Sequence, residues 1–478
     1  MTESGVEKAE GTQEPQLRRV MGPGLLLLFI VGDILGTGVY ALTGQVAKEV
    51  GGAAWLPFLL AFLIATITAF SYLELVTKYP QAAGAALYVH KAFGIQFLTF
   101  LVAFVVMCSG ITSASTASRF FAANFFTAFE LDWGKAGVVA LALLFMALVA
   151  MVNFRGVGES VKLNVILTII EITGLALVIL VGLWAFTGGG AEVDFSRVVA
   201  FDTPADKGTF LAVTTATSLA FFAMVGFEDS VNMAEETKDP VRIFPKVLLS
   251  GLGIAGVVYV IVAIVAVALV PVGVLAASET PLVEVVKTGA PGLPIEKILP
   301  VISMFAVSNT ALINMLMASR LIYGMSRQHV LPPMLGVIHP RRLTPWVAIG
   351  FTTLIAFGLI FYVSAFANSN AIAMLGGTTS LLLLAVFAMV NVAVLVLRRD
   401  VRGAGEHFRT PTVLPVLGFL FSAYLVLPFS GRPSQQYLLA GILILTGVVL
   451  FGVTTLINRR LGIRDAGITD TTDLSGGS

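Results

Sequence analysis

Apolar segments long enough to cross a lipid bilayer recur along almost the whole of the 478-residue chain. A helix needs about 20 residues to span a hydrocarbon core of about 30 Å. Only 12% of the residues are charged, against roughly 25% in an ordinary soluble domain. The sequence therefore predicts an all-α integral membrane protein with twelve transmembrane helices and short connections, at 22–47, 52–78, 93–122, 136–153, 163–186, 210–235, 247–270, 296–323, 345–365, 371–397, 412–430 and 436–458.

The basic residues predict the orientation of these spans. If the N-terminus is placed in the cytoplasm and each span crosses the membrane in turn, 21 of the 29 Lys and Arg residues lie on the cytoplasmic side. Loops facing the cytoplasm carry an excess of Lys and Arg, so we expect both termini in the cytoplasm and a multi-pass protein of a bacterial plasma membrane. The first span has no signal-peptide cleavage site and is expected to be retained. Lipid is an expected partner, and nucleic acid is not.

Two of the spans are interrupted. The first contains GDILGTG at 32–38, where glycine weakens a helix and a carboxylate in hydrocarbon costs about 2.5–3.5 kcal/mol. The sixth contains Gly226, five spans after Gly36. Because five is odd, a second repeat would cross the membrane in the opposite direction, as in the inverted repeats of many secondary transporters. The predicted organisation is a tail at 1–21, five-helix repeats at 22–186 and 209–398, helices 11 and 12 at 411–458, and a tail at 459–478.

Unwound segments at the middle of the membrane leave backbone groups that a ligand can bind. The outer half of the first span would begin with free amides and the positive end of its dipole, which attract an anion. The outer half of the sixth span would end with carbonyls, which attract a cation. An α-amino acid carries both charges. The predicted ligands are Gly36, Thr37 and Gly38 for its carboxylate, and Phe222, Ala223 and Val225 for its ammonium group.

Four stretches also resemble the amino acid-polyamine-organocation superfamily, especially its bacterial members that are similar to cationic amino acid transporters. They are GDILGTGVYALTG, SYLELVTKYPQAAGAALYVHKAFG, FFAMVGFEDSVNMAEETKDPVRIFP and SRLIYGMSRQHVLPPMLGVIHPRRLTPWVAI. The resemblance implies two intertwined inverted repeats of five helices plus two further helices, which move amino acids or related amines by alternating access. It implies the same two backbone ligand sets, and it makes Phe227 the aromatic residue that closes over the substrate from the outside.

The ionisable residues within the spans are candidates for energy coupling. Some family members carry a lysine in the middle of helix 5, but here the ionisable residue in that middle is Glu171, so the lysine mechanism does not carry over. Asp33, Glu171 and Glu228 each need a partner or a proton in hydrocarbon. We expect protons to be the coupling ion and Glu171 to be the first candidate. The alternative is that the three are hydrogen-bonded between helices as structural polar groups.

Other functions remain open or are disfavoured. An exchanger of amino acids and polyamines stays open, and so does a sensor that binds without transport. An intramembrane aspartyl protease lacks the first glycine of its motif, because Ile30 stands there. No enzyme activity, metal or cofactor is predicted, and the single Cys108 excludes a multi-cysteine metal site. Neutral and cationic amino acids remain equally open as substrates, because no acidic side chain is placed in the expected side-chain pocket. The expected pocket residues are Cys108, Ser109, Thr112, Asn309 and Thr378. The oligomeric state is also open.

Overall fold

The computed structural model describes residues 21–80, 84–155, 160–188, 191–234, 237–327, 329–342, 344–366, 371–399 and 407–460. The predicted tails at 1–21 and 459–478 lie almost entirely outside these residues.

The described chain is helical, and its only β-pairings are the isolated bridges Met21 to Thr237 and Gly51 to Phe201. The α-helices are α1 (Pro23–Ile34), α2 (Thr37–Val50), α3 (Trp55–Lys78), α4 (Gly84–Phe93), α5 (Gln96–Ala128), α6 (Gly134–Arg155), α7 (Ser160–Phe186), α8 (Thr209–Ala220), α9 (Pro240–Leu269), α10 (Val272–Ala277), α11 (Pro281–Gly289), α12 (Ile295–Arg327), α13 (Trp346–Phe366), α14 (Ala371–Leu397), α15 (Val413–Val426) and α16 (Ser434–Arg460). The 3-10 turns are η1 (Gly52–Ala54), η2 (Arg197–Val199), η3 (Phe221–Met224), η4 (Asp229–Met233), η5 (Pro333–Gly336) and η6 (Pro428–Ser430).

Eleven helical segments among the described residues are long and apolar enough to cross a membrane. The segments Pro23–Val50 and Thr209–Met233 each contain a break and each count as one span. The predicted span at 412–430 forms the shorter apolar helix α15, of 14 residues. The prediction of an all-α membrane protein is confirmed, and the exact number of twelve spans stays a prediction.

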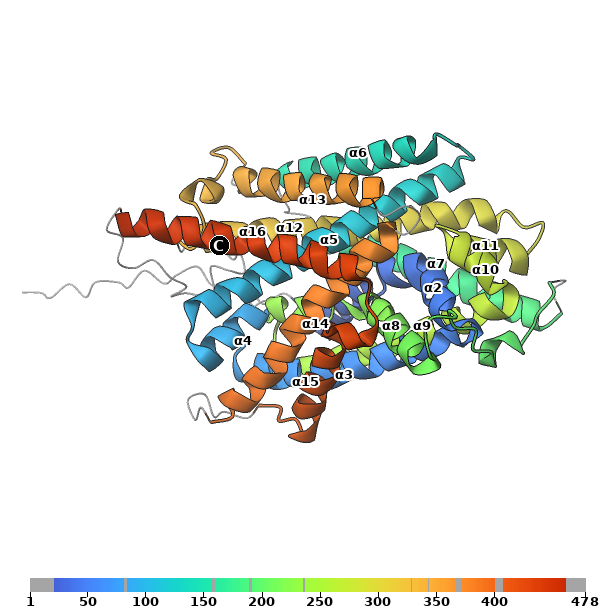
Figure 1. Ribbon diagram of the computed structural model, residues 1–478, viewed down its shortest axis with the longest axis horizontal. Coiled ribbons are helices and arrows are strands. Elements are labelled where there is room, and N and C mark those ends of the chain that lie inside the picture. Colours follow the sequence, from blue (N-terminus) through green and yellow to red (C-terminus); the bar gives the residue numbers. More distant parts are fainter. Residues whose placement is uncertain are drawn as a thin grey trace, which may run out of the picture.

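The long helices form a bundle with two distinct ends (Figure 1). We call the end where Met21 pairs with Thr237 the tail end, and the end where Gly51 pairs with Phe201 the far end. Helices α10 and α11 lie together at the far end in Figure 1.

The broken spans lie inside the bundle. In the most apolar window of the α1–α2 span 78% of the residues are buried, against 22% in α16. Exposed leucines instead cover the outer helices, among them Leu144 and Leu148 on α6 and Leu445 and Leu456 on α16. Backbone groups freed at a break can find partners only inside the protein or in water, because lipid offers none. The breaks are therefore buried, and the apolar outer helices face lipid.

A buried arginine holds the first half of the second broken span in position. Arg432, in the connection between α15 and α16, donates from Nη2 to the Ser218 carbonyl of α8 at 3.2 Å. It also donates to the carbonyls of Gly377 on α14 at 2.8 Å and Leu425 on α15 at 2.7 Å. The two C-terminal helices are therefore tied to the helices that surround the breaks.

Candidate functional site

The first break separates α1 from α2. Helix α1 ends at Ile34, and Gly36 has the non-helical angles φ −45° and ψ −146° before α2 begins at Thr37. The hydroxyl of Tyr259 on α9 donates to the Ile34 carbonyl, so one acceptor released by the break is satisfied. The amides that open α2 belong to Thr37 and Gly38, as the sequence predicted.

The second break follows α8. Helix α8 passes into the 3-10 turn η3, Val225 is extended with φ −69° and ψ 142°, and Gly226 has a φ of +122°. Residues with a side chain rarely adopt such a positive φ, which explains a glycine at this position. The Gly226 amide donates to Oε2 of Glu228 at 2.9 Å. The Phe222 carbonyl accepts from the Val225 amide at 3.3 Å, and a carbonyl keeps a second lone pair for a further donor.

The two breaks contact each other through their backbones. A methyl group added to Gly38 would lie 2.3 Å from Cα of Ala223, and one added to Gly226 would lie 2.8 Å from the Asp33 carbonyl oxygen. Both approaches are too close for any side chain. Glycine at these two positions therefore brings the two unwound segments together.

A small cavity of about 20 Å³ lies between the breaks. Five of the six predicted ligands line it, and Ala223 forms the wall against Gly38. The cavity is lined by Asp33, Ile34, Gly36, Thr37, Gly38, Ser113, Phe222, Val225, Gly226, Asp229, Thr310 and Asn314.

Phe227 lies outside this cavity and is fully buried. Its ring packs against Tyr72 of α3 and Phe387 of α14, with centroid distances of 5.7 and 5.2 Å. The residue follows the break in a span that runs from the far end to the tail end, so it lies on the tail-end side of the break. If the tails are cytoplasmic, this is the inner side. The role of Phe227 as an aromatic residue that closes over the substrate stays a prediction.

Of the expected pocket residues, Ser109 lines a neighbouring cavity beside the second break, while on α5 and α12 the small cavity is lined by the residues next to Thr112 and Asn309. Thr112 is hydrogen-bonded to Thr379 at 2.7 Å, and its neighbour Ser113 lines the small cavity. Likewise Thr310, rather than Asn309, lines the cavity from α12. One residue rotates a side chain by about 100° around a helix, and the apolar pattern of a deeply buried helix does not fix its rotation that closely.

Glu171 lies on α7, level with the first break. Its side chain is fully buried, and neither carboxylate oxygen has a hydrogen-bond partner among the described residues. One turn away, Thr168 faces Gly32 of α1, where a methyl group would lie 1.8 Å from the Thr168 hydroxyl. The Tyr40 hydroxyl of α2 donates to the Glu171 backbone carbonyl at 3.0 Å. Glu171 thus lies beside both halves of the first broken span.

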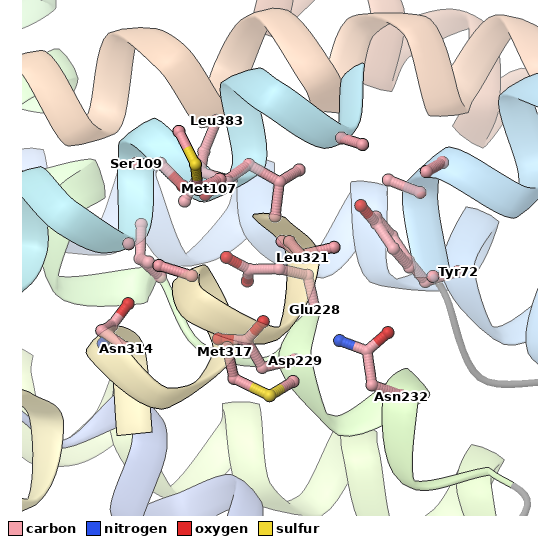
Figure 2. Close-up of a pocket in the computed structure, with 18 residues that line it drawn as sticks. Tyr72, Met107, Ser109, Glu228, Asp229, Asn232, Asn314, Met317, Leu321 and Leu383 are labelled. Carbon is pink, nitrogen blue, oxygen red and sulfur yellow. Dashed lines mark hydrogen bonds between the residues drawn. The ribbon is translucent and has the colours of Figure 1, made fainter. Parts of the chain in front are cut away.

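A second cavity, of about 50 Å³, opens on the tail-end side of the second break (Figure 2). Glu228 and Asp229 project into it between α5 and α12, as Figure 2 shows. Val225, Asp229 and Asn314 line both cavities, so the two adjoin. No sequence pattern pointed to Asn314 or Tyr72, because a polar residue in a span marks no particular neighbour until the helices are packed.

The described residues form six salt bridges, and none of them includes Asp33, Glu171, Glu228 or Asp229. Asp33 lies against the second break and is 6% exposed, with Oδ2 lacking a hydrogen-bond partner in this part of the chain. The structure thus brings Asp33 next to Glu228 and Asp229 at the crossing of the breaks, while Glu171 comes from α7.

Comparison with proteins of known identity gives relatives along nearly the full chain. The methylthioribose transporter of Bacillus subtilis is 27% identical over 462 residues, covering 93% of this chain and 94% of the relative. The branched-chain amino acid permease BcaP of the same organism is 25% identical over 458 residues, covering 92% and 93%. The chloroplastic cationic amino acid transporter 9 of Arabidopsis thaliana is 30% identical over 349 residues, covering 69% and 59%.

The fold is similar to the crystal structure of a single-residue mutant of the Eremococcus coleocola manganese transporter. The TM-score is 0.56 at 15% identity, with 92% of this chain and 94% of that chain covered. At this identity the likeness concerns the fold alone. The family model described as amino acid permease matches residues 25–451. The chain is therefore a membrane transporter rather than an enzyme, and it belongs to the amino acid permease family.

Proposed function

We propose that this protein takes up amino acids across the plasma membrane by proton-coupled secondary transport with alternating access. The observation that carries the proposal is the small cavity between the breaks, where the amide end of α2 faces the segment that ends α8. A helix N-terminus favours a carboxylate, and carbonyl oxygens favour an ammonium group. An α-amino acid matches both over a distance of a few bonds.

The contacts at the far end support a state closed on that side. A methyl group on Gly44 of α2 would lie 2.0 Å from the Leu275 carbonyl oxygen of α10, and Gln45 donates to the Ala276 carbonyl at 3.1 Å. Arg119 of α5 approaches Glu279, between α10 and α11, at 3.9 Å. Of the two cavities beside the breaks, the one of about 50 Å³ lies on the tail-end side, while a hollow of about 390 Å³ at the far end is lined by Gln45 and Glu279. With cytoplasmic tails, this state is closed to the outside, and transport requires a second state in which α10 separates from α2.

Glu171 is the proposed proton site. A buried carboxylate without a cation is stable only when it is protonated or finds a new partner, and Glu171 lies beside the backbone that unwinds at the first break. Protonation of Glu171 would shift the balance between the outward-open and inward-open states only if the two states bind the proton with different affinity. Each tenfold difference in proton affinity shifts that balance by about 1.4 kcal/mol. Asp33 and then Glu228 are the next candidates.

Uptake by proteoliposomes tests the proposal. A panel of labelled amino acids is offered with and without an inward proton gradient, and we expect the gradient to accelerate uptake in wild type. Because glutamine mimics a protonated glutamate, Glu171→Gln should keep exchange between equal pools and lose that acceleration. Glu192→Gln, in an exposed loop, is the matched control. Normal acceleration in Glu171→Gln would exclude Glu171 as the coupling site.

The same assay separates the alternatives. An exchanger of amino acids and polyamines would take up substrate only into preloaded vesicles. A sensor would bind amino acids and move none in either condition. If no amino acid is bound or transported, the proposed function is wrong.

A further inference from the structure

We propose that the cavity containing Glu228 and Asp229 is a subsite for a second positive charge, so that the preferred substrates are amino acids with a cationic side chain. This inference rests on the proposed function, because it places the α-carboxylate and α-ammonium in the small cavity between the breaks.

The two cavities are arranged for one elongated ligand. Val225, Asp229 and Asn314 line both. A ligand whose α-carbon groups lie between the breaks therefore passes Asp229 as its side chain enters the larger cavity. In Figure 2 the Asp229 carboxylate points toward Asn314 and Met317, and Glu228 lies above it on the same segment.

The electrostatics of this subsite call for a cation. Glu228 is 7% exposed, and its carboxylate accepts from backbone amides, among them that of Gly226 at 2.9 Å, rather than from a cationic side chain. Asp33 lies against the same break with an unpartnered Oδ2. No salt bridge among the described residues neutralises these carboxylates. Burying a carboxylate without a partner costs several kcal/mol, and an ammonium or guanidinium group on the ligand removes that cost.

Buried polar groups outside the acidic cluster also point to a ligand. The Tyr72 hydroxyl is fully buried and has no hydrogen-bond partner within the described residues, although Tyr72 lines the larger cavity (Figure 2). The hydroxyls of Thr37 and Thr310, 1% and 6% exposed, line the small cavity and also lack a partner there. Buried polar atoms are almost always hydrogen-bonded, so these groups mark where a polar ligand would complete the structure.

The walls match a flexible aliphatic stem with a charged tip. Met107, Met317, Leu321 and Leu383 supply apolar surface beside the carboxylates. A branched neutral side chain would contact this surface and leave Glu228 and Asp229 unpaired, whereas a diamine would leave the amides of Thr37 and Gly38 unpaired. The described residues hold no group of three or more His, Cys, Asp or Glu suited to a metal ion. A cationic amino acid satisfies both ends.

Competition by matched ligands tests the subsite in the full-length protein. Lysine and norleucine have side chains of similar length and differ in the terminal ammonium. We expect wild type to bind lysine at least about tenfold more tightly, which corresponds to about 1.4 kcal/mol. The lysine-to-norleucine affinity ratio should fall by a similar factor in Asp229→Asn and in Glu228→Gln. Asp206→Asn, on an exposed far-end loop, should leave the ratio unchanged.

The wild-type ratio decides the inference even if a variant fails to fold. Equal affinity for norleucine and lysine would overturn the cation subsite and leave amino acid transport standing. Putrescine has no carboxylate, so equal affinity for putrescine and lysine would show that the ligand needs no carboxylate and would overturn the inference. An unchanged ratio in both acidic variants, each monodisperse in detergent, would show that other residues select the charge. Binding of no amino acid at all would reject the proposed function instead.

Discussion

At the scale of single residues, two glycines determine whether the small cavity between the breaks can form. Gly38 and Gly226 are the points where the broken spans touch, and neither leaves space for a Cβ atom. At an open helix position such as Gly24, alanine is favoured over glycine by about 1 kcal/mol. At these two positions a side chain would instead push one backbone away from the other and open the cavity between them.

Gly38→Val should therefore abolish amino acid binding while the protein still inserts and remains monodisperse. The added Cβ would lie 2.3 Å from the backbone of Ala223, which cannot move without displacing η3. Isothermal titration or scintillation proximity binding measures the effect. Gly24→Val on α1, where no atom lies within 4 Å of the added carbon, is the matched control and should bind normally. Unchanged affinity in Gly38→Val would reject the site.

The predicted carboxylate ligand can be tested without mutation. Amides and esters of the transported amino acid lack the anion that the α2 amides would bind. They should compete at least about a hundredfold less well than the parent amino acid, about 2.7 kcal/mol of binding free energy. Competition of labelled uptake measures this ratio. Equal competition would show that the first break does not bind a carboxylate.

At the scale of elements, helix α7 presents a polar face to α1. Asn164, Thr168 and Glu171 are spaced four and three residues apart, which places them on one side of a helix. All three are at most 6% exposed, and each carries a polar side-chain atom without a partner among the described residues. This polar face runs from the tail-end half of α7 toward Glu171.

Thr168→Val should slow proton-driven uptake by a few-fold or more and leave exchange between equal pools intact. Valine keeps the shape of threonine and removes the hydroxyl one turn from Glu171. Thr173→Val is a matched control on the same helix, since Thr173 is exposed and bonds only its own helix at Ile169. Equal acceleration by the gradient in the two variants would show that the polar face has no part in coupling.

A second interaction between elements closes the bundle at the tail end. Glu74 of α3 binds Arg398 at the end of α14 through two hydrogen bonds of 2.8 and 2.7 Å, and it also accepts from the Thr410 amide at 2.9 Å. The Glu74 side chain is 4% exposed and that of Arg398 is 13% exposed. This pair links α3, α14 and the segment that leads to α15.

Arg398→Ala should destabilise the detergent-solubilised protein by about 3–5 kcal/mol, because it leaves the Glu74 carboxylate buried and unpaired. Thermal unfolding followed by tryptophan fluorescence measures the shift. Glu74→Gln combined with Arg398→Ala should recover part of the loss, since the uncompensated charge is gone. A double variant less stable than Arg398→Ala alone would contradict this explanation.

At the scale of the whole molecule, the charge distribution and the packing lead to one orientation and one state. The excess of basic residues at the tail end predicts that this end faces the cytoplasm. In the predicted orientation, the contacts of α10 with α2 lie on the outer side, and the cavity beside Glu228 and Asp229 lies toward the inner side. Apolar outer helices and buried breaks are consistent with this arrangement in a bilayer.

Cysteine labelling in intact cells tests the orientation. The one native cysteine, Cys108, is fully buried and should give little background. Asp206→Cys, in an exposed far-end loop, should react with an impermeant maleimide from outside. Arg341→Cys, exposed near the tail end, should react only after permeabilisation. The reverse pattern would invert the topology and the assignment of the closed side.

The sequence by itself determined the membrane class, the helical fold and the two breaks, and it predicted the backbone groups that would bind the substrate. These depend on local properties: apolar length, the position of glycine, and the direction in which each span runs. Five of the six predicted ligands line the cavity for that reason. Only the tertiary structure decided which side chains meet there. It turned Phe227 into the packing between α3 and α14, replaced Thr112 and Asn309 by their neighbours Ser113 and Thr310, and brought Asp229 and Asn314 into both cavities. The physical reason is that a membrane helix is apolar both where it faces lipid and where it packs, so no polar face fixes its rotation and its facing residues are set by packing against helices distant in the chain.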